Sequence, residues 1–314
     1  MSRFRPGSSN SGASSTMPTT SEAGSEVAWT SEMLSGLAYC DAGFTSPACR
    51  VGRTAIWSET AVGGRSARHL VFRLLPSQLA LLATNTNQSE AAQHGVYLYM
   101  CPLSTAKDTL DASGTAAIAP EFPDGCTVSS AKGDISRTFI STSSMELPID
   151  ITDMINWSHN MVHMIQVSYQ SNDAWVATVM MATRQTVTSA QASIVGSNRI
   201  SAQTVLEQMF NSADAVDEDE DEDAIEAGAC LTMRCPLGLS RIRTPVRSLR
   251  CTHPQCFDLE NFLELNSQMQ TWECPVCSLA IGSWKDLLVD EFFQQILDSV
   301  LEDENSVTVC PDGT

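Results

Sequence analysis

Five cysteines and one histidine lie close together in the last third of the chain, at spacings that suit a metal site. They occur as Cys235, Cys251-x-His253-x-x-Cys256 and Cys274-x-x-Cys277. A Cys-x-His pair and a distant Cys-x-x-Cys together offer three thiolates and one imidazole, a donor set that tetrahedral zinc takes in structural sites. The sequence therefore predicts a zinc ion held by Cys251, His253, Cys274 and Cys277.

The order of these residues also fits part of a RING-type arrangement, in which eight successive ligands hold two ions in a cross-brace. The four predicted ligands fill the third, fourth, seventh and eighth places, and Cys235 and Cys256 fill the first and fifth. The second and sixth places fall on Gly238 and Leu259, which cannot coordinate a metal. Two ligands are too few for a closed structural site. We therefore predict one zinc ion, at the second site.

The residues around the cluster resemble the Siz/PIAS-type RING, also called the SP-RING or MIZ zinc finger. The resemblance is carried by Cys235-Pro-Leu-Gly, Arg241-x-x-x-Pro245-x-Arg247, Cys251-x-His253-x-x-Cys256-Phe-Asp and Trp272-x-Cys274-Pro-x-Cys277. It covers roughly residues 230–300, and this family keeps a single zinc ion. Upstream, Pro148-Ile-Asp-Ile-Thr152 is similar to the Pro-Ile-Asn-Ile-Thr box of the PINIT domain in the same family, with Asp150 in place of Asn.

The resemblance implies a SUMO ligase, a RING-type acyltransferase that supplies no nucleophile. Such a ligase binds the conjugating enzyme that carries SUMO as a thioester, and it holds SUMO in a pose that a substrate lysine can attack. We therefore expect no catalytic residue and no covalent intermediate on a cysteine of this chain. The expected partners are the conjugating enzyme, SUMO and protein substrates in the nucleus, with the PINIT-like domain helping to place the substrate or the conjugating enzyme.

Several residues receive roles by analogy with this family. The conjugating enzyme is expected to dock on Leu237, Pro275 and Trp272, although core burial is an alternative for Leu237, and a core anchor beside Cys274 is the favoured alternative for Trp272. At the first site, the expected structural residues are Cys235, Cys256, Arg241 and Arg247. The two cysteines would act there as small, weakly hydrogen-bonding side chains, and the two arginines would form ion pairs.

Five segments must position these residues. The Ser/Thr/Gly-rich residues 1–25 are predicted to be disordered. Residues 26–212 should form a PINIT-like β-rich domain, 213–228 an acidic linker, 229–300 the SP-RING zinc domain and 301–314 an acidic and strand extension. The expected fold class is thus α+β and multi-domain, with a β-rich PINIT-like domain before a small, single-zinc, RING/U-box-like domain.

Local patterns predict some elements within these segments. Residues 164–169 alternate in polarity, and the apolar run 175–181 follows after the turn formers Ser171-Asn-Asp, which predicts a hairpin. Residues 201–210 read as a helix capped by Ser201. His159 and His163 are expected to be ordinary polar residues before the strand.

Two further helices are predicted to frame the zinc site. Asp258 should cap the first, which carries Leu259, Phe262 and Leu263. The second is marked by a helical stripe of apolar residues, most of it expected to pack on the zinc module. This stripe consists of Val289, Phe292, Phe293, Ile296, Leu297 and Val300.

The formal charge of −19 comes from 18 basic and 37 acidic residues. Nine of the acids lie in residues 214–226 and five in 298–314, neither of which holds a base. The remaining chain is nearly neutral, so nucleic-acid binding is not supported. The run Asp217–Asp223 reads either as a linker or as a tract for a basic partner. Val307–Val309, beside Glu302–Glu304, reads either as a strand or as a SUMO-binding motif.

Compartment and rival functions follow from the same features. No apolar run approaches the roughly 20 residues of a membrane-spanning helix, so no membrane association is expected. Thiols at metal-like spacings favour a reducing compartment, and the family implies the nucleus. The rival functions are a non-catalytic adaptor for transcription or chromatin proteins, and a ubiquitin ligase of the U-box kind, whose fold holds no zinc.

Overall fold

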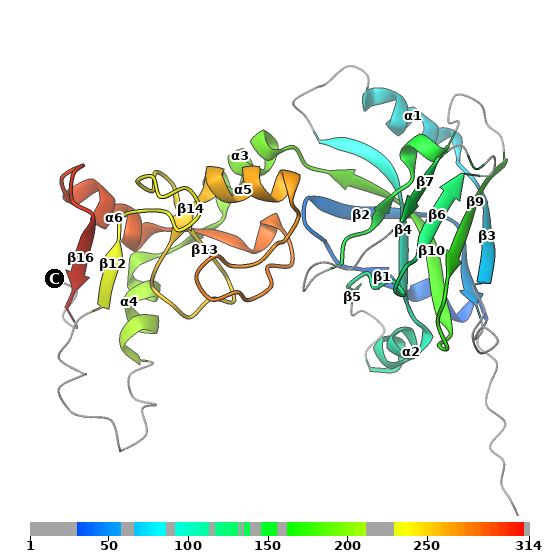
Figure 1. The fold of residues 1–314 in the computed structure, drawn as a ribbon, viewed down its shortest axis with the longest axis horizontal. Helices are drawn as coiled ribbons and strands as arrows, with labels where there is room; N and C mark the ends of the chain where they lie inside the picture. The colour runs from blue at the N-terminus through cyan, green and yellow to red at the C-terminus, as the bar shows by residue number, and fades with distance from the viewer. Residues whose placement is uncertain are drawn as a thin grey trace, which may run out of the picture.

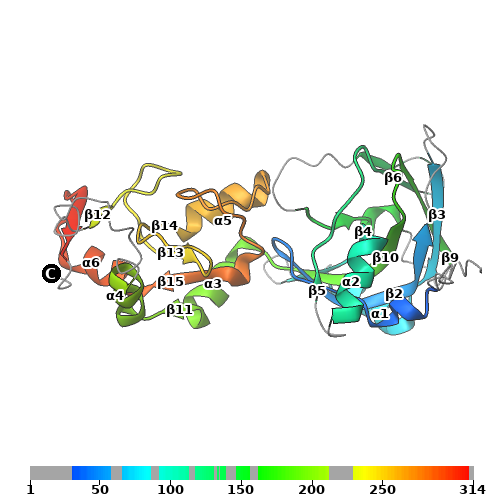
Figure 2. The same cartoon turned by 90° about the horizontal axis from the view of Figure 1, so that it is seen from below.

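The computed structural model describes residues 30–57, 66–85, 92–112, 117–130, 133, 135–138, 146–155, 162–211 and 229–310. In Figure 1 these residues form two bodies that lie end to end, and the perpendicular view in Figure 2 shows the same elongated arrangement. The predicted disordered segment 1–25 and the acidic run Asp217–Asp223 lie outside the described residues. Among the described helices, none is long and apolar enough to cross a membrane.

The first body is a β-sandwich of two antiparallel four-stranded sheets. One sheet has the order β2 (Thr45–Trp57), β10 (Trp175–Arg184), β4 (Gln93–Pro102), β8 (Ile149–Asp150). The other has the order β3 (Ser66–Arg73), β9 (Val162–Tyr169), β6 (Thr127–Ser130), β7 (Ser136–Thr138). Apolar side chains from both sheets, such as Leu98 and Val167, form a shared core. Helix α1 (Pro76–Thr84) adds Leu82 to that core.

The hairpin predicted over residues 164–181 is wrong. β9 and β10 are consecutive strands, but β9 pairs with β3 and β6, whereas β10 pairs with β2 and β4 in the opposite sheet. β9 alternates because only one of its faces packs on the core, while β10 is buried on both faces. A change from an alternating pattern to a continuous apolar run therefore marked a crossing between sheets.

His163 differs from its prediction as a polar residue before the strand. It lies within β9, it is only 8 % exposed, and its ring lies 5.8 Å from that of Phe72, measured between centroids. Burial lowers the pKa of this imidazole. His163 is therefore a neutral packing residue of the sandwich.

The outer face of the β2-β10-β4-β8 sheet has its own covering layer. That layer consists of the 3₁₀ turn η1 (Met33–Gly36), the parallel pair β1 (Ala38–Tyr39) and β5 (Ala117–Ile118), and α2 (Leu103–Ala112). Its residues form a second cluster with the outward side chains of β10, Val176 and Met180. Two covered faces explain why the central strand tolerates so few polar residues.

The PINIT-like box forms β8 and the turn after it, η3 (Thr152–Met154). The Asp150 Oδ1 atom accepts a hydrogen bond of 2.9 Å from the backbone N–H of Thr152, whose Oγ1 atom accepts one of 2.9 Å from the Val96 N–H. A carboxylate and an amide oxygen can both fill this acceptor role. The departure from Asn at position 150 therefore leaves the turn intact.

The second body begins near residue 187, before the expected boundary at residue 212. Helices α3 (Val187–Ser197) and α4 (Ala202–Asn211) place Ala190, Ile194 and Val205 in the same core as the zinc module. Between the helices, β11 (Arg199–Ile200) pairs in parallel with β15 (Leu287–Asp290). The predicted helix over 201–210 is present and is capped by Ser201, whose Oγ accepts from the Thr204 N–H, but it belongs to the second body.

The rest of the second body comes from residues 229–310. Its elements are β12 (Ala229–Thr232), β13 (Pro245–Ser248), β14 (Phe257–Asp258), α5 (Leu259–Gln268), η6 (Trp284–Asp286), β15, α6 (Glu291–Ser299) and β16 (Ser306–Val309). The predicted cap of α5 is confirmed, since Asp258 Oδ1 accepts from the Asn261 N–H at 3.1 Å. The apolar stripe packs on the core, although Val289 lies in β15. Val307–Val309 lies in β16, which pairs with β12.

The two bodies touch through the loop before β2. The Gly43 N–H donates to the Gly282 carbonyl at 3.0 Å, and the Gly43 carbonyl accepts from the Trp284 N–H at 3.2 Å. Beside them, Lys285 Nζ lies 2.7 Å from Asp41 Oδ2. Gly43 has a φ of +57°, and a Cβ atom there would lie 2.8 Å from the Trp272 Nε1 atom. This position thus requires glycine both for its backbone and for the close approach.

We expect Gly43→Ala to destabilise the junction through this contact. The matched control is Gly125→Ala, because Gly125 has a similar φ of +64° but a Cβ atom there meets nothing within 4 Å. Both variants carry the cost of a left-handed alanine, and only Gly43→Ala adds overpacking, which typically costs about 1–3 kcal/mol. Urea unfolding followed by tryptophan fluorescence measures the difference. Equal losses of unfolding free energy in the two variants would show that the close contact with Trp272 does not exclude a side chain at position 43.

Candidate metal centre

The four predicted ligands meet in one place. The ligand atoms of Cys251, His253, Cys274 and Cys277 all lie within 4.8 Å of one another, and no other described group of three or more His, Cys, Asp or Glu residues does this. The Cys251 and Cys277 sulfurs are 3.8 Å apart, and His253 Nε2 is 3.3 Å from the Cys274 sulfur. Ligands at about 2.0–2.3 Å from a tetrahedral zinc have similar separations. The donor set and its geometry therefore fit a zinc ion.

The imidazole of His253 is held in the tautomer that a metal ligand needs. Its Nδ1 atom lies 2.8 Å from the carbonyl oxygen of Gln255. A carbonyl oxygen can only accept, so Nδ1 carries the proton and the Nε2 lone pair points to the sulfurs. A backbone acceptor on the second nitrogen is a common way to orient a metal-binding histidine.

Two of the three sulfurs, those of Cys251 and Cys274, perturb each other strongly. The hydrogen bond from the Cys251 thiol lowers the pKa of Cys274 to about 3, and the same contact together with burial raises the pKa of Cys251. The pair thus holds one proton between two sulfurs, because two neighbouring thiolates repel each other. A divalent cation removes this repulsion and allows every thiol of the cluster to ionise.

Two turns with the same backbone conformation, residues 274–278 and 235–239, each form the metal-binding knuckle of one RING-type site. In one turn, the Cys274 carbonyl accepts from the Ser278 N–H at 2.9 Å. In the other, the Cys235 carbonyl accepts from the Leu239 N–H at 2.8 Å. Ser278 has a φ of 59° and Leu239 a φ of 55°. The first turn presents Cys274 and Cys277, whereas the second presents Cys235 and Gly238. The chain thus keeps the backbone of a metal knuckle at a place with a single thiol.

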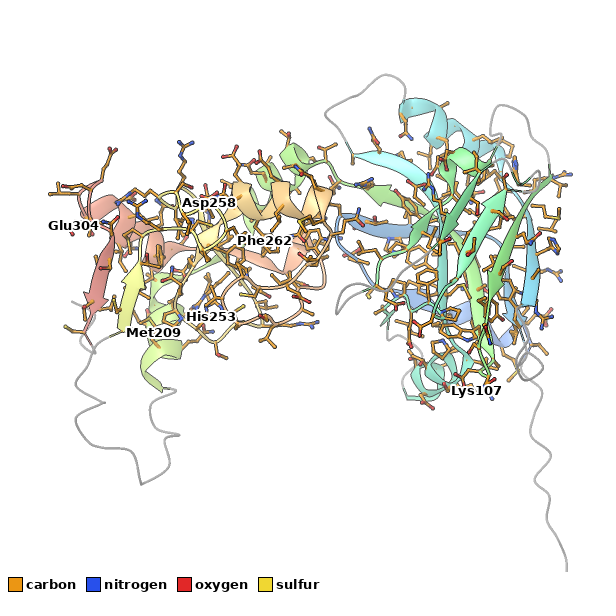
Figure 3. The ribbon with its side chains drawn as sticks, in the orientation of Figure 1. Lys107, Met209, His253, Asp258, Phe262 and Glu304 are labelled. Carbon is orange, nitrogen blue, oxygen red and sulfur yellow. The ribbon has the colours of Figure 1, made fainter. Side chains whose placement is uncertain are left out.

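Hydrogen bonds organise this first site. The Cys235 sulfur accepts from the Asp258 N–H at 3.3 Å, and the Asp258 Oδ2 atom accepts from the Arg243 N–H at 2.9 Å. A Cβ atom at Gly238 would lie 2.8 Å from Asn261 Nδ2, so an amide side chain fills the space of the missing ligand. Leu259 is fully buried. Figure 3 labels His253 and Asp258, which mark the metal cluster and the first site in the same body.

Arg247 forms the predicted ion pair, and it is almost completely buried. Its Nε atom lies 3.2 Å from Asp290 Oδ2, while its two terminal nitrogens donate to the His253 carbonyl at 2.9 Å and to Gln208 Oε1 at 3.1 Å. Asp290 caps α6 through the Phe293 N–H at 2.9 Å. One guanidinium therefore connects α4, α6 and the loop of a metal ligand.

The other first-site residues behave in two ways. Arg241 makes no ion pair with a described residue; instead, its guanidinium donates to the carbonyl oxygens of Leu297, Glu302 and Glu304, and so fixes the chain after α6. Cys256 is fully buried, and desolvation raises its pKa well above the ordinary value. It therefore stays a neutral thiol, as expected for a packing residue.

The three expected docking residues separate into two kinds. Leu237 and Pro275 are half-buried and lie on the two equivalent turns. Trp272 has no exposed surface and packs edge-on against Phe44, with ring centroids 4.9 Å apart. Docking through Trp272 is incompatible with this burial, and the alternative of a core anchor holds.

The two turns also expose apolar residues that were not among the predicted docking residues. Leu239 is 70 % exposed and Leu279 is 48 % exposed, directly after the two knuckles. Leu239 closes the turn that starts at Cys235, and Leu279 comes one residue after Ser278, which closes the turn that starts at Cys274. The available signal was an apolar residue four positions after Cys235 and five positions after Cys274.

Family models match two parts of the chain. A PINIT domain covers residues 47–183, and a MIZ/SP-RING zinc finger covers residues 231–280. The chain thus contains both domains of the Siz/PIAS-type family. The predicted fold class is confirmed, with a β-rich PINIT domain before the SP-RING body.

Relatives extend over much of the chain. It is 29 % identical over 282 residues to the E3 SUMO-protein ligase pli1 of Schizosaccharomyces pombe, a match that covers 87 % of this chain and 34 % of that protein. It is 38 % identical over 107 residues to the E3 SUMO-protein ligase SIZ1 of Oryza sativa, covering 33 % and 12 % of the two chains. The chain thus spans about a third or less of these relatives.

Solved structures share the fold. The SUMO E3 ligase SIZ2 of S. cerevisiae superposes with a TM-score of 0.60 at 18 % identity, covering 87 % of this chain and 98 % of that one. SIZ1 of the same yeast gives 0.59 at 22 % identity, covering 88 % and 92 %. Both comparisons extend over the two bodies and the junction between them.

We expect Arg247→Met to destabilise the second body severely. It leaves the Asp290 carboxylate buried without its cation, which typically costs about 3–5 kcal/mol. Asp290→Asn keeps an oxygen for the α6 cap and removes the charge, so the double variant should recover a large part of that loss. Guanidinium unfolding of the wild type, both single variants and the double variant measures the coupling. Purely additive losses would contradict a dominant role for the ion pair.

Proposed function

We propose that this chain acts as a SUMO ligase, and that its SP-RING body promotes transfer of SUMO from a loaded conjugating enzyme to lysine. The observation that carries the proposal is the pair of equivalent turns beside the metal cluster, which present Leu237 and Pro275 at the positions where RING-type modules bind conjugating enzymes. The two relatives compared above, from Schizosaccharomyces pombe and Oryza sativa, bear the name E3 SUMO-protein ligase. The partners are then a SUMO-conjugating enzyme, SUMO and protein substrates, and the location is the nucleus.

The proposed activity rests on positioning. The conjugating enzyme brings SUMO as a thioester on its own cysteine, so this chain forms no covalent bond to SUMO. The half-buried Leu237 and Pro275 contact the enzyme, and the surface around them restricts the thioester to orientations that a lysine can attack. Restricting two reactants in this way can lower a barrier substantially without acid–base groups. The PINIT domain, fixed through Gly43, places the substrate or the conjugating enzyme relative to that surface.

We also propose a single zinc ion on Cys251, His253, Cys274 and Cys277. When bound, zinc ties the loop of the first two ligands to the turn of the last two. The first site needs no ion, because its hydrogen bonds involve Cys235, Asp258 and Asn261 instead.

Metal content tests this proposal. Purified protein should contain one equivalent of zinc per chain by elemental analysis. Cys277→Ser should lose most of it, whereas Cys256→Ser should keep it, because that thiol lies at the first site. Two equivalents would place a second ion at the first site, and none would favour the U-box kind of module.

Discharge of SUMO from its loaded conjugating enzyme to free lysine tests the activity. The wild type should accelerate discharge, and Leu237→Ala should remove most of the acceleration, by about tenfold or more, as expected when an interface anchor is truncated. Leu81→Ala is the matched control, since Leu81 is 42 % exposed on α1 of the other body. If the zinc-loaded wild type does not accelerate discharge, the ligase proposal is contradicted and the non-catalytic adaptor becomes the favoured function.

A further inference from the structure

A groove crosses the junction between the two bodies. It consists of two hollows, of about 460 Å³ and about 180 Å³, which share Phe44 and Arg184 in their walls. The larger is lined by β-sandwich residues, including Leu147 and Ile149, and by the exposed Gln270 of the SP-RING body. Figures 1 and 2 show that β2 and α5 approach each other where the bodies meet. Two adjacent hollows with shared wall residues suit an extended chain better than a compact small molecule.

The smaller hollow has a single charged group. Arg184 is half-buried there, and its guanidinium makes no hydrogen bond or ion pair with another described residue. The remaining lining is polar or apolar without a carboxylate, and consists of Phe44, Gln93, Gln185, Thr186, Val187 and Ser267. A partly desolvated cation beside amide and hydroxyl groups favours an anion, and guanidinium binds carboxylates in a two-pronged geometry.

The larger hollow differs in character. Apart from Arg184, which it shares with the smaller hollow, its cation is Arg137, which is already paired with Asp153 at 2.5 Å and donates to the Asp150 carbonyl at 2.6 Å. Asp150 also lines this hollow and disfavours a second acidic group in it. Phe44, Leu147 and Ile149 supply apolar surface instead. The larger hollow therefore suits an uncharged apolar side chain.

We propose that this groove binds an extended polypeptide segment of the protein to be modified, with an acidic side chain against Arg184 and a neighbouring apolar side chain on Phe44, Leu147 and Ile149. The proposal deepens the ligase function and rests on it for the identity of the occupant. The groove contains residues of both bodies, so a bound segment is held at a fixed place relative to the metal centre. Recognition then acts on substrate choice and not on the transfer chemistry.

Peptide binding tests the groove without any SUMO transfer. The probe is a fluorescein-labelled peptide of about ten residues, with one Leu and one Glu in a Gly/Ser background, titrated by anisotropy with the full zinc-loaded chain. Replacing its Glu with Gln, or using Arg184→Gln protein, should weaken binding by about tenfold, the effect of losing one charge-assisted contact. Arg184→Lys should be intermediate, and added salt should weaken only the Glu peptide.

The matched control is Arg53→Gln, since Arg53 is an exposed arginine elsewhere on β2 and does not line either hollow. It should bind the Glu peptide as the wild type does. Equal binding by Arg184→Gln and the wild type, or no binding by the wild type up to about 1 mM, would overturn the proposal. A Ser/Gly replacement of Asp217–Asp223 that tightens peptide binding would assign the groove to the chain's own acidic run, and would overturn it too.

The two proposals fail separately. If peptide binding depends on Arg184 but the protein does not accelerate SUMO discharge, the proposed ligase activity is contradicted and the proposed peptide groove is supported. If the protein accelerates SUMO discharge but does not bind the peptide, the proposed peptide groove is contradicted and the proposed ligase activity is supported.

Discussion

The second body depends on a buried guanidinium. Arg247 lies among α4, α6 and the His253 loop, and each of its three nitrogen atoms faces a polar partner; two of these partners, Gln208 and Asp290, are distant in the sequence. Removing a charge from water is costly, so such a group is tolerated only when each of its donors has a partner. The metal cluster and the helix that precedes the acidic run therefore share one constraint. Their positions are set together, even though nearly 40 residues separate Gln208 from Arg247.

The two knuckle turns show that one backbone form can be stabilised in two ways. At Cys274, the turn belongs to a cluster of sulfurs that needs a cation for full ionisation. At Cys235, the same turn is completed by the Asp258 N–H and by the Asn261 side chain in the space beside Gly238. Loss of metal should thus affect one half of the module more than the other. The asymmetry also keeps Leu237 on a turn whose geometry does not depend on a metal.

Sequence reasoning predicted the features that short-range chemistry determines. The cluster of Cys251, His253, Cys274 and Cys277, the Asp258 cap and the apolar stripe of α6 all follow from spacing and from periodicity. The sequence-based predictions failed where contacts between residues far apart in the chain determine the structure. The hairpin was wrong because β9 and β10 join different sheets, and α3 and α4 were placed in the first domain because their partner strand lies far downstream. The junction at Gly43 has no local signal, because its requirement for glycine comes from Trp272.

The pairing of β11 with β15 has a consequence for synthesis. Arg199 pairs with Val289, so 90 residues must be added to the nascent chain after β11 before its partner exists. At about 5–20 residues per second, this takes roughly 5–20 s. During that interval the apolar faces of α3 and α4, including Ile194 and Val205, have no core to enter and are exposed to aggregation or to chaperones. The β-sandwich, whose last strand ends at Arg184, has no such delay.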